Sequence, residues 1–361
     1  MPTQSAPDEF LAPPTTDPTP IFDTFRGNYG TELMVAAIAH LGLFEILTAG
    51  PLSFENLRGR LRLNPRPANV LLTGLAAMKL LARQDGPDGG IYQLTPLAEE
   101  HLVPGRPLYV GGYVTQAAKS AGVRELVDRL RSDRATVERT GATDAKGTAF
   151  TFRPGTESAM DSDETARSLT MILAGRAKNV APVLADRLPL PETKLLLDIG
   201  GGTGIYAFAL LQRNPSLRAI VWDRASVLKV AHEMALQHGV ADRVEFRPGD
   251  MFHDPVPTGC DAMLLSNVLH DWDVPECEAL VSRCAAALPP GGRLLIHDVF
   301  LNDNLDGPLP IALYSAALFC ITEGRAYSGK EYRQWMQAAG LSPEPIVPTL
   351  VNCGVLAGIK E

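Results

Sequence analysis

The sequence predicts an α/β protein in which a doubly wound parallel sheet follows a mainly helical N-terminal domain. From Lys194 onward, short apolar runs alternate with amphipathic stretches, which is typical of parallel strands joined by helices. Between Tyr29 and about Leu102, three helical patterns precede two short strands around a turn rich in Gly, Pro and Asp. This second arrangement is the layout of a winged helix, so we expect two domains in the 361-residue chain.

The elements of the N-terminal domain are predicted from periodicity and start signals. Residues 31–47 have apolar side chains at helical spacing, and Ser53 begins a second helix as its N-cap. A third helix is expected within 65–81, and two strands within 82–96. The third helix stands where a DNA-binding winged helix reads the major groove, but its faces are mostly Leu, Ala and Val. A groove-reading helix presents Arg, Lys, Asn or Gln, so this helix indicates a dimer interface instead.

Composition and charge narrow the partners and the compartment. The net charge is −8 and no block of Lys or Arg stands out, which argues against a nucleic-acid partner. No apolar run is long enough to span a membrane, and the N-terminus lacks the regions of a secretory signal. The five cysteines form no CxxC pair, so we expect reduced thiols in a cytoplasmic protein. Residues 1 to about 20, rich in Pro and Thr, are expected to be a disordered arm.

The C-terminal domain is predicted from its alternating pattern. A long helix is expected after residues 161–164. Strands are expected at 194–200, 218–223, 243–250, 261–269 and 292–300, with helices at 204–215, 225–239 and 275–288 between them. In a sheet of this kind the ligand lies beyond the carboxyl ends of the strands, at the topological switch point.

The stretch "DIGGGTG" places Gly200 and Gly202 between a strand and a helix. Glycine permits positive φ and lets a ligand approach the backbone closely, while the N-terminus of the next helix favours a negative group such as a carboxylate. Starting from Gly202, the sequence also satisfies the looser GxGxxA form. The loop by itself therefore leaves a dinucleotide site open.

Acidic residues at the strand ends favour a different nucleoside. Asp198, Asp223 and Asp250 each lie at or near the end of one of the first three predicted strands. Asp223 is placed to accept hydrogen bonds from ribose hydroxyls, and Asp250 from an adenine amino group. Met251 and Phe252 offer soft and aromatic surface to a purine ring. A pyrophosphate would be repelled by three carboxylates, whereas S-adenosylmethionine carries a sulfonium and an ammonium group.

Six stretches, in order along the chain, carry a family resemblance: "LTPLAEEHL", "DIGGGTG", "GDMF", "LHDW", "PGGRLLIHD" and "EGRAYSGKEY". From about Tyr29 to the end, the chain resembles the class I small-molecule O-methyltransferases of the plant caffeate and bacterial hydroxyneurosporene type. The resemblance implies a homodimer that uses S-adenosyl-L-methionine and no metal. It also implies a winged-helix dimerisation domain at 21–105, linking helices that line the substrate site at 106–187, and a Rossmann-like domain at 188–361.

The resemblance also implies roles for the cofactor-binding residues. Gly200 and Gly202 would face the methionine part, Asp223 the ribose, and Asp250 and Met251 the adenine. Ser266 stands where plant members often have a lysine near the cofactor, and Trp272 matches the tryptophan that borders the adenine pocket.

His270 in "LHDW" matches the general base of the family, and Asp298 matches an acidic residue that hydrogen-bonds this histidine. A neutral imidazole can take the proton of a phenol as the oxygen attacks the methyl group. The plant pattern has a second acidic partner where this chain has Ala326, and Glu323 is nearby but out of register. His297 alternates with Asp298 along its strand and is expected to point to the opposite face as a structural residue.

The acceptor site is implied by the resemblance and by side chains that grip planar rings. The residues expected to line it are Phe152, Met160, Met171, Tyr314 and Phe319. An aromatic molecule with a phenolic hydroxyl is the leading acceptor class. Methylation of carbon or nitrogen, a non-methylating reaction with the same cofactor, and a regulator that senses S-adenosylmethionine remain alternatives.

Overall fold

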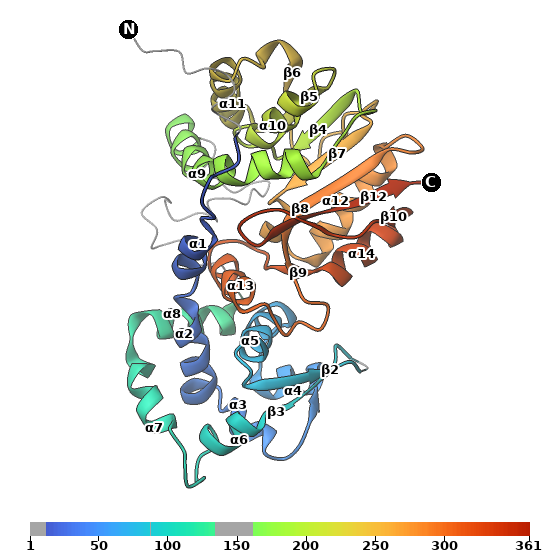
Figure 1. Cartoon of the computed structure of the whole chain (residues 1–361). Helices are drawn as coiled ribbons and strands as arrows, with labels where there is room; N and C mark the ends of the chain where they lie inside the picture. Colours follow the sequence, from blue (N-terminus) through green and yellow to red (C-terminus); the bar gives the residue numbers. More distant parts are fainter. Residues whose placement is uncertain (1–11, 87, 134–161) are drawn as a thin grey trace. The chain divides into compact units, whose positions relative to one another are not determined.

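The computed structural model of the chain describes residues 12–86, 88–133 and 162–361 (Figure 1). Its contacts divide the chain into two units. The sheet unit is built mainly from described residues within Glu138–Phe300 and Gly329–Glu361, and the helical unit from those within Ile21–Val137 and Leu301–Ser328. Both units agree with the predicted fold class, an α/β sheet domain and a mainly helical N-terminal domain.

The sheet unit contains a doubly wound sheet with strand order β10-β12-β8-β7-β4-β5-β6. The strands are β4 (Leu195–Ile199), β5 (Arg218–Asp223), β6 (Val244–Pro248), β7 (Ala262–Ser266), β8 (Arg293–Leu301), β10 (Leu341–Pro343), β11 (Val347–Pro348) and β12 (Cys353–Lys360). Strands β4 to β8 are parallel. At one edge, β12 runs antiparallel to β8, and β10 runs antiparallel to β12. The chain winds from β4 through β5 to β6 and then returns to the other side of β4 as β7. The topological switch point therefore lies between β4 and β7.

Among the described residues of this unit, five helices accompany the sheet (Figure 1). They are α9 (Asp163–Arg187), α10 (Ile205–Arg213), α11 (Ala225–Gln237), α12 (Val274–Ala287) and α14 (Gly329–Ala338), with short 3-10 turns η4 (Ala241–Arg243) and η5 (Leu269–Asp271). Helix α9 packs against α10 and α11, and α12 packs against α14. The central strands are buried apolar runs, as expected for a sheet covered on both faces.

The helical unit contains the two predicted strands and the helices around them. Its helices are α1 (Thr19–Arg26), α2 (Tyr29–Val35), the π-helix η1 (Ala36–His40), α3 (Leu43–Leu47), α4 (Phe54–Leu61), α5 (Pro65–Ala77), α6 (Pro96–His101), α7 (Gly111–Val114), the 3-10 helix η2 (Thr115–Lys119), α8 (Ala121–Ser132) and α13 (Leu309–Ile321). Strands β1 (Leu52–Ser53), β2 (Leu81–Gln84) and β3 (Ile91–Leu94) form an antiparallel sheet, and β9 (Tyr327–Ser328) follows α13. The Ser53 side chain accepts a hydrogen bond from Asn56 N at 3.3 Å, which confirms it as an N-cap.

Three details differ from the sequence-based expectations. The helix predicted over 31–47 is broken, because Gly42 adopts a left-handed conformation (φ +57°) between η1 and α3. Helix α9, expected among the linking helices, groups with the sheet unit because it packs on α10. Residues 301–328, expected in the Rossmann-like domain, group with the helical unit because α13 packs on α5.

Helix α5 is buried inside its own chain. Nearly all its residues are buried, and its contacts are with α13, α2, α8 and β2. The interpretation of this helix as a dimer surface was therefore wrong, because its apolar faces are already covered. The same burial leaves it no free face for a DNA groove.

Candidate active site at the carboxyl edge of the sheet

The glycine loop after β4 has the conformation that only glycine adopts without strain. Gly200 and Gly202 have φ values of +63° and +58°. A Cβ placed on Gly202 would meet nothing within 4 Å, so open space lies above this backbone. The loop is therefore an accessible cradle, as a site for a small molecule requires.

Asp223 holds this loop in place. Its Oδ2 accepts a hydrogen bond from Gly202 N at 2.8 Å, and its Oδ1 accepts one from Arg224 N at 2.7 Å. Burial raises the pKa of Asp223, and these two backbone donors oppose the rise. Asp223 thus lies at the edge of the loop, where ribose hydroxyls are expected.

Asp198 lies beneath the loop and is 1% exposed. A Cβ placed on Gly201 would come within 2.8 Å of Asp198 Oδ2, so only glycine fits above this carboxyl. Burial, with the nearby charge of Asp223, raises the pKa of Asp198 to about 8. This carboxyl group is therefore mostly protonated at neutral pH, unlike the charged strand-end residue that the sequence suggested.

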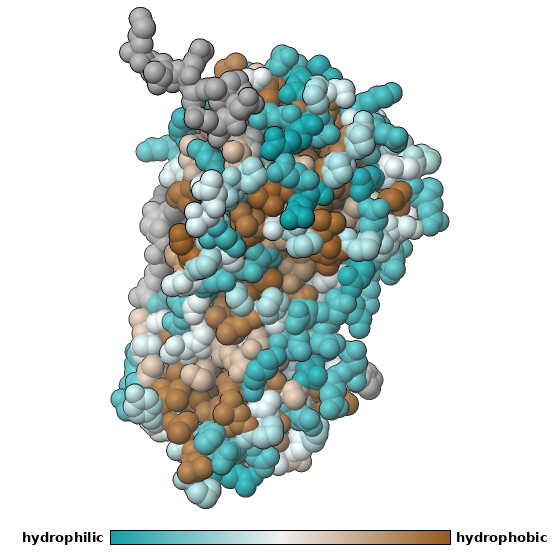
Figure 2. Space-filling model, viewed as in Figure 1, coloured by the Kyte–Doolittle hydropathy of each residue, from teal (hydrophilic) through white to brown (hydrophobic). Residues whose placement is uncertain are grey.

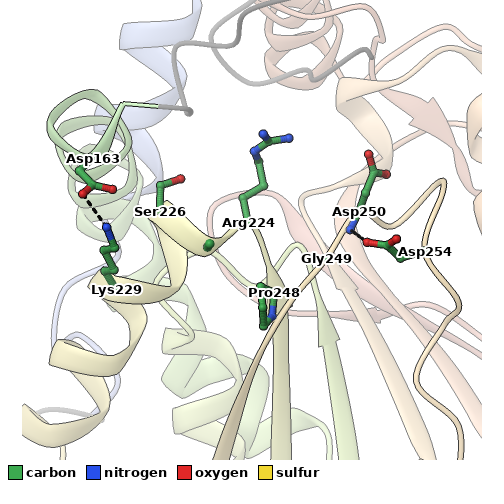
Figure 3. A pocket seen from close by; sticks show the side chains of 9 residues that line it. Asp163, Arg224, Ser226, Lys229, Pro248, Gly249, Asp250 and Asp254 are labelled. Atoms are coloured by element: carbon green, nitrogen blue, oxygen red, sulfur yellow. Dashed lines mark hydrogen bonds and ion pairs between the residues drawn. The ribbon is translucent and has the colours of Figure 1, made fainter. Parts of the chain in front are cut away.

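Asp250 lines a cavity of about 610 Å³ beside β5 and β6 (Figure 3). The other lining residues are Asp163, Arg224, Ala225, Ser226, Lys229, Pro248, Gly249 and Asp254. The Asp250 carboxylate also accepts hydrogen bonds from the backbone N–H groups of Phe252 and His253. Its turn is thereby fixed, and Figure 3 shows its side chain and that of Arg224 near the same space.

The aromatic residues expected near the cofactor lie together. Phe252 and Trp272 pack edge to face, with ring centroids 4.5 Å apart. Trp272 is 4% exposed, whereas Met251 and Phe252 are half-buried. The loop after β6 and the segment after β7 thus share an aromatic contact.

Ser266 ends β7, and its hydroxyl takes part in a polar cluster. Its Oγ lies 2.8 Å from His297 Nδ1 and accepts a hydrogen bond from Asn267 Nδ2 at 3.1 Å. His297 is fully buried, and its Nε2 lies 3.2 Å from Thr349 Oγ1. Burial, helped by the charge of Arg176, lowers the pKa of His297 to about 3. This neutral, buried histidine agrees with the structural role expected for it.

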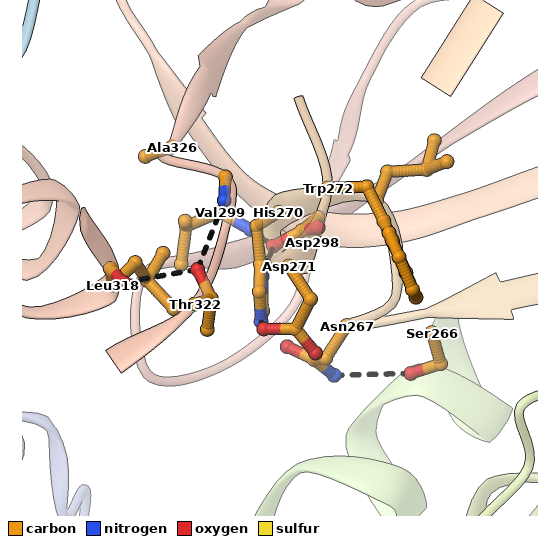
Figure 4. A network of polar contacts seen from close by, with 12 residues as sticks. Ser266, Asn267, His270, Asp271, Trp272, Asp298, Val299, Leu318, Thr322 and Ala326 are labelled. Carbon is orange, nitrogen blue, oxygen red and sulfur yellow. Dashed lines mark hydrogen bonds and ion pairs between the residues drawn. The ribbon is translucent and has the colours of Figure 1, made fainter. Parts of the chain in front are cut away.

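His270 lies in η5, directly after β7, and its side chain is buried (Figure 4). Its Nδ1 is 2.6 Å from Asp298 Oδ1, on the neighbouring strand β8. Asp298 is itself held by the backbone N–H of Val299 and by the hydroxyl of Tyr332, which donates to Oδ2 at 3.2 Å. Because the carboxylate only accepts, Nδ1 carries the proton and Nε2 is left with the lone pair.

A second carboxylate approaches the other side of the same ring. Asp271 Oδ1 lies 3.7 Å from His270 Nε2 (Figure 4). Burial alone would lower the pKa of His270, but Asp298 and Asp271 outweigh it and raise this pKa above its ordinary value. Burial by itself would raise the pKa of Asp298. The pairing of this carboxylate with His270 and its hydrogen bonds outweigh burial, so the pKa of Asp298 lies below its ordinary value. The arrangement is a base whose protonated form is stabilised by two acids.

Two partners of this dyad were missed by sequence reasoning. Asp271 stands in the quoted stretch "LHDW" but was given no role, and Tyr332 lies in "SGKEY". The expectation of a single carboxylate partner for His270 was therefore incomplete. Ala326, where a second acid was expected, is fully buried, and its N–H donates to Ser315 Oγ.

The residues expected at the acceptor site have different environments. Phe152 and Met160 lie outside the described residues. Met171 is 39% exposed on α9. In the helical unit, the Arg26 guanidinium lies 3.8 Å from the ring centroid of Tyr314, whereas Phe319 is 1% exposed in the apolar core. The packing of Phe319 favours a core role over a substrate wall.

The described residues also bear on metal binding and on membrane insertion. Across residues 12–86, 88–133 and 162–361, no group of three or more His, Cys, Asp or Glu side chains is arranged to hold a metal ion. Within the same ranges, no helix combines the length and the apolar character needed to cross a membrane.

Comparison with known proteins gives matches along most of the chain. A family model described as an O-methyltransferase domain matches residues 145–342, and one described as an O-methyltransferase dimerisation domain matches residues 23–104. The 3-hydroxy-5-methyl-1-naphthoate 3-O-methyltransferase of Streptomyces sahachiroi is 34% identical over 352 residues, covering 96% of this chain and 97% of that protein. The acetylserotonin O-methyltransferase of Bos taurus is 31% identical over 325 residues, covering 88% of this chain and 90% of that protein.

A solved structure is similar over nearly the whole length. The crystal structure of an O-methyltransferase family 2 protein from Planctomyces limnophilus, in complex with apigenin, superposes with a TM-score of 0.86. The two sequences are 49% identical, and the alignment covers 97% of this chain and 98% of that one.

Proposed function

Because this chain belongs to the O-methyltransferase family, we propose that it transfers a methyl group from S-adenosylmethionine to a phenolic hydroxyl, with His270 as the general base. The family resemblance seen in the sequence is confirmed, and the cofactor is S-adenosylmethionine. One observation carries the proposed role of His270: its buried imidazole lies 2.6 Å from Asp298 at the topological switch point.

The residues at the edge of the sheet fit this cofactor. We assign Gly200 and Gly202 to its methionine part, because open space lies above Gly202. We assign Asp223 to the ribose and the turn of Asp250 and Met251 to the adenine, because Asp250 lines the cavity beside β5 and β6. Phe252 and Trp272 form the aromatic border, and Ser266 supports the loop after β7.

The protein's part in the reaction is to take up a proton at one atom. When bound, S-adenosylmethionine supplies a methyl group on a sulfonium that an oxygen nucleophile can displace. His270 Nε2 accepts the proton of the acceptor hydroxyl, and Asp298 keeps Nδ1 protonated. Asp271 and Asp298 then stabilise the imidazolium that forms, since both carboxylates lie beside the ring.

The acceptor we propose is a planar aromatic molecule with a phenolic hydroxyl. The relatives support this class, because one acts on a hydroxynaphthoate and the 49% identical structure is a complex with apigenin. We assign Met171 and Tyr314 to the acceptor site, together with Phe152 and Met160. Phe319 is left out of this assignment, because its ring lies in the apolar core of the helical unit, beside the guanidinium of Arg66.

We also propose that the active form is a homodimer that uses the helical unit. The matched dimerisation domain spans residues 23–104. Apolar side chains are exposed on this unit, as Figure 2 shows for the face in view. They include Ile21, Phe25, Leu97, Leu108, Val110 and Tyr113. Exposed apolar surface of this kind marks protein–protein contacts.

The test is a methyl-transfer assay with S-adenosylmethionine and a panel of flavones, hydroxynaphthoates and catechols. We expect an O-methylated product, and we expect His270→Ala to lose activity by about 10²- to 10⁴-fold while cofactor affinity is retained. Undiminished phenol methylation by this variant would refute the role of His270. A methyl group found on carbon or nitrogen would refute the proposed reaction and favour the alternatives left open by the sequence.

A further inference from the structure

At the carboxyl edge of the sheet, the methionine carboxylate of S-adenosylmethionine has only a partial counterpart, the N-terminus of α10 after the glycine loop. Its sulfonium and ammonium groups suit the carboxylates at the strand ends, but its methionine carboxylate needs a cation or several hydrogen-bond donors. Ser266 and His297, which lie near the glycine loop, are neutral groups. A full positive charge for this carboxylate would come from a neighbouring element.

Arg176, in the middle of α9, brings a guanidinium to this place. Its Nη1 donates to Asn267 Oδ1 at 2.6 Å, and its Nη2 donates to Cys353 Sγ at 2.7 Å. Asn267 is fixed in turn, because its backbone N–H donates to the His297 carbonyl at 2.8 Å and its Nδ2 donates to Ser266 Oγ. The guanidinium is thus held at the carboxyl end of β7.

Three contacts join this end of β7 to the glycine loop. Strands β4 and β7 pair in parallel, with Ile199 opposite Leu265. A Cβ placed on Gly200 would lie 3.2 Å from Val268 Cγ2, so the residue after Asn267 packs directly against the loop. From α10, which begins after the loop, Tyr206 OH accepts a hydrogen bond from Asn267 Nδ2 at 3.3 Å.

The backbone conformation of Asn267 determines where its side chain meets Arg176. Asn267 has a left-handed backbone (φ +56°), a conformation that asparagine adopts more readily than most residues. Its side chain therefore stands between Arg176 and Tyr206 instead of continuing the line of β7. Arg176 is the positively charged side chain within the described cluster of Arg176, Tyr206, Ser266, Asn267, His297 and Cys353.

We propose that Arg176 binds the carboxylate of S-adenosylmethionine, so that helix α9 and not β7 supplies the cation for the cofactor. This inference rests on the proposed function. A guanidinium matches a carboxylate with two parallel N–H donors, and Asn267 orients it from the side of β7. Burial, helped by the charge of Arg176, keeps the neighbouring His297 neutral, so no second cation competes for the same carboxylate.

The experiment compares two ligands that differ only in this carboxylate. Isothermal titration measures the affinity for S-adenosylmethionine and for decarboxylated S-adenosylmethionine, with the wild type, Arg176→Gln and Arg176→Lys. The wild type is expected to prefer the carboxylate-bearing ligand by roughly 10- to 100-fold. Arg176→Gln is expected to lose this preference by weakening only the carboxylate-bearing ligand, and Arg176→Lys to recover part of it.

Arg167→Gln is the matched control. It lies on the same helix, where its side chain is 54% exposed and pairs with Glu233, so it should behave as the wild type does. If Arg176→Gln weakens both ligands equally, Arg176 is only a structural tie to Asn267 and Cys353, and the inference is overturned. Equal affinity of the wild type for the two ligands overturns it without any variant. Failure of the wild type to bind either ligand would overturn the proposed function as well.

Discussion

At the scale of single residues, the pKa of His270 is raised by two carboxylates that come from different parts of the chain. Asp271 is its neighbour in sequence, whereas Asp298 lies on the next strand and is held there by Val299 N and Tyr332. The rise in the pKa of His270 is therefore a product of the fold as well as of the motif.

The first prediction concerns the pH dependence of the reaction. A base must be neutral to accept a proton, so kcat/KM should fall as the pH drops through the raised pKa of His270. Asp298→Asn removes one of the charges that raise this pKa, so the fall should move to lower pH while the maximal rate decreases. Profiles of kcat/KM against pH for both proteins test this, and an unmoved limb in the variant would contradict it.

The second prediction concerns Asp198, whose pKa is about 8. Below that pH the carboxyl group is neutral, so the affinity for the cationic cofactor should increase as the pH rises from 7 to 9. Asp198→Asn resembles the neutral form in shape and should remove this increase while the protein stays folded. Titration of S-adenosylmethionine at several pH values measures the effect, and a variant with the same pH dependence as the wild type would speak against it.

At the scale of elements, Arg66 ties three helices of the helical unit together. It lies in the first turn of α5 and is 7% exposed. Its guanidinium donates to Asp133 at the end of α8 and to the carbonyls of Thr322 and Gly324 after α13. Its charge also lies over the ring of Phe319. The segment 301–328 is therefore fastened to the helical unit by a buried cation as well as by apolar packing.

The third prediction follows from this network. Arg66→Ala leaves the buried carbonyl groups of Thr322 and Gly324 without this donor and removes the cation beside Asp133. Unfolding should therefore become easier by about 3 kcal/mol. Arg106→Ala removes an arginine that is 48% exposed and paired with Glu99, and should change stability by less than about 0.5 kcal/mol. Urea unfolding of both variants gives the comparison, and equal effects would show that the buried network contributes little.

At the scale of the whole molecule, the proposed dimer places the exposed apolar side chains of the helical unit between two copies. Phe25 and Tyr113 are each 80% exposed, which is unusual for rings of this size. Their burial between two copies would remove apolar surface from water, at roughly 25 cal/mol for each Å². The dimer is therefore expected to depend on these rings.

The fourth prediction is that Phe25→Asp and Tyr113→Asp convert the dimer into a monomer, because each places a charge in an apolar interface. Leu236→Asp is the matched control, since this leucine is 59% exposed on α11 of the sheet unit. Light scattering after size-exclusion chromatography gives the mass of each variant. Dimers that persist in both helical-unit variants would exclude this surface as the interface.

The order of the motifs by itself determined the fold class, the family and the cofactor. Alternating apolar runs specify parallel strands, because crossover helices leave few other topologies. The glycines after β4 and the aspartates at the strand ends could also be predicted from the sequence as parts of a ligand site. Each of them meets a local requirement on backbone shape or on charge. His270 and Asp298 were identified from the family resemblance, and they meet because η5 follows β7 beside the neighbouring strand β8.

Only the tertiary structure decided which distant side chains meet at the site. It brought Tyr332 to Asp298 and Arg176 to Asn267, pairs separated by 34 and 91 positions along the chain. It also buried Asp198 deeply enough to raise its pKa, and it joined the segment 301–328 to the helical unit. These outcomes depend on packing and on the removal of water, and no local pattern of residues encodes them.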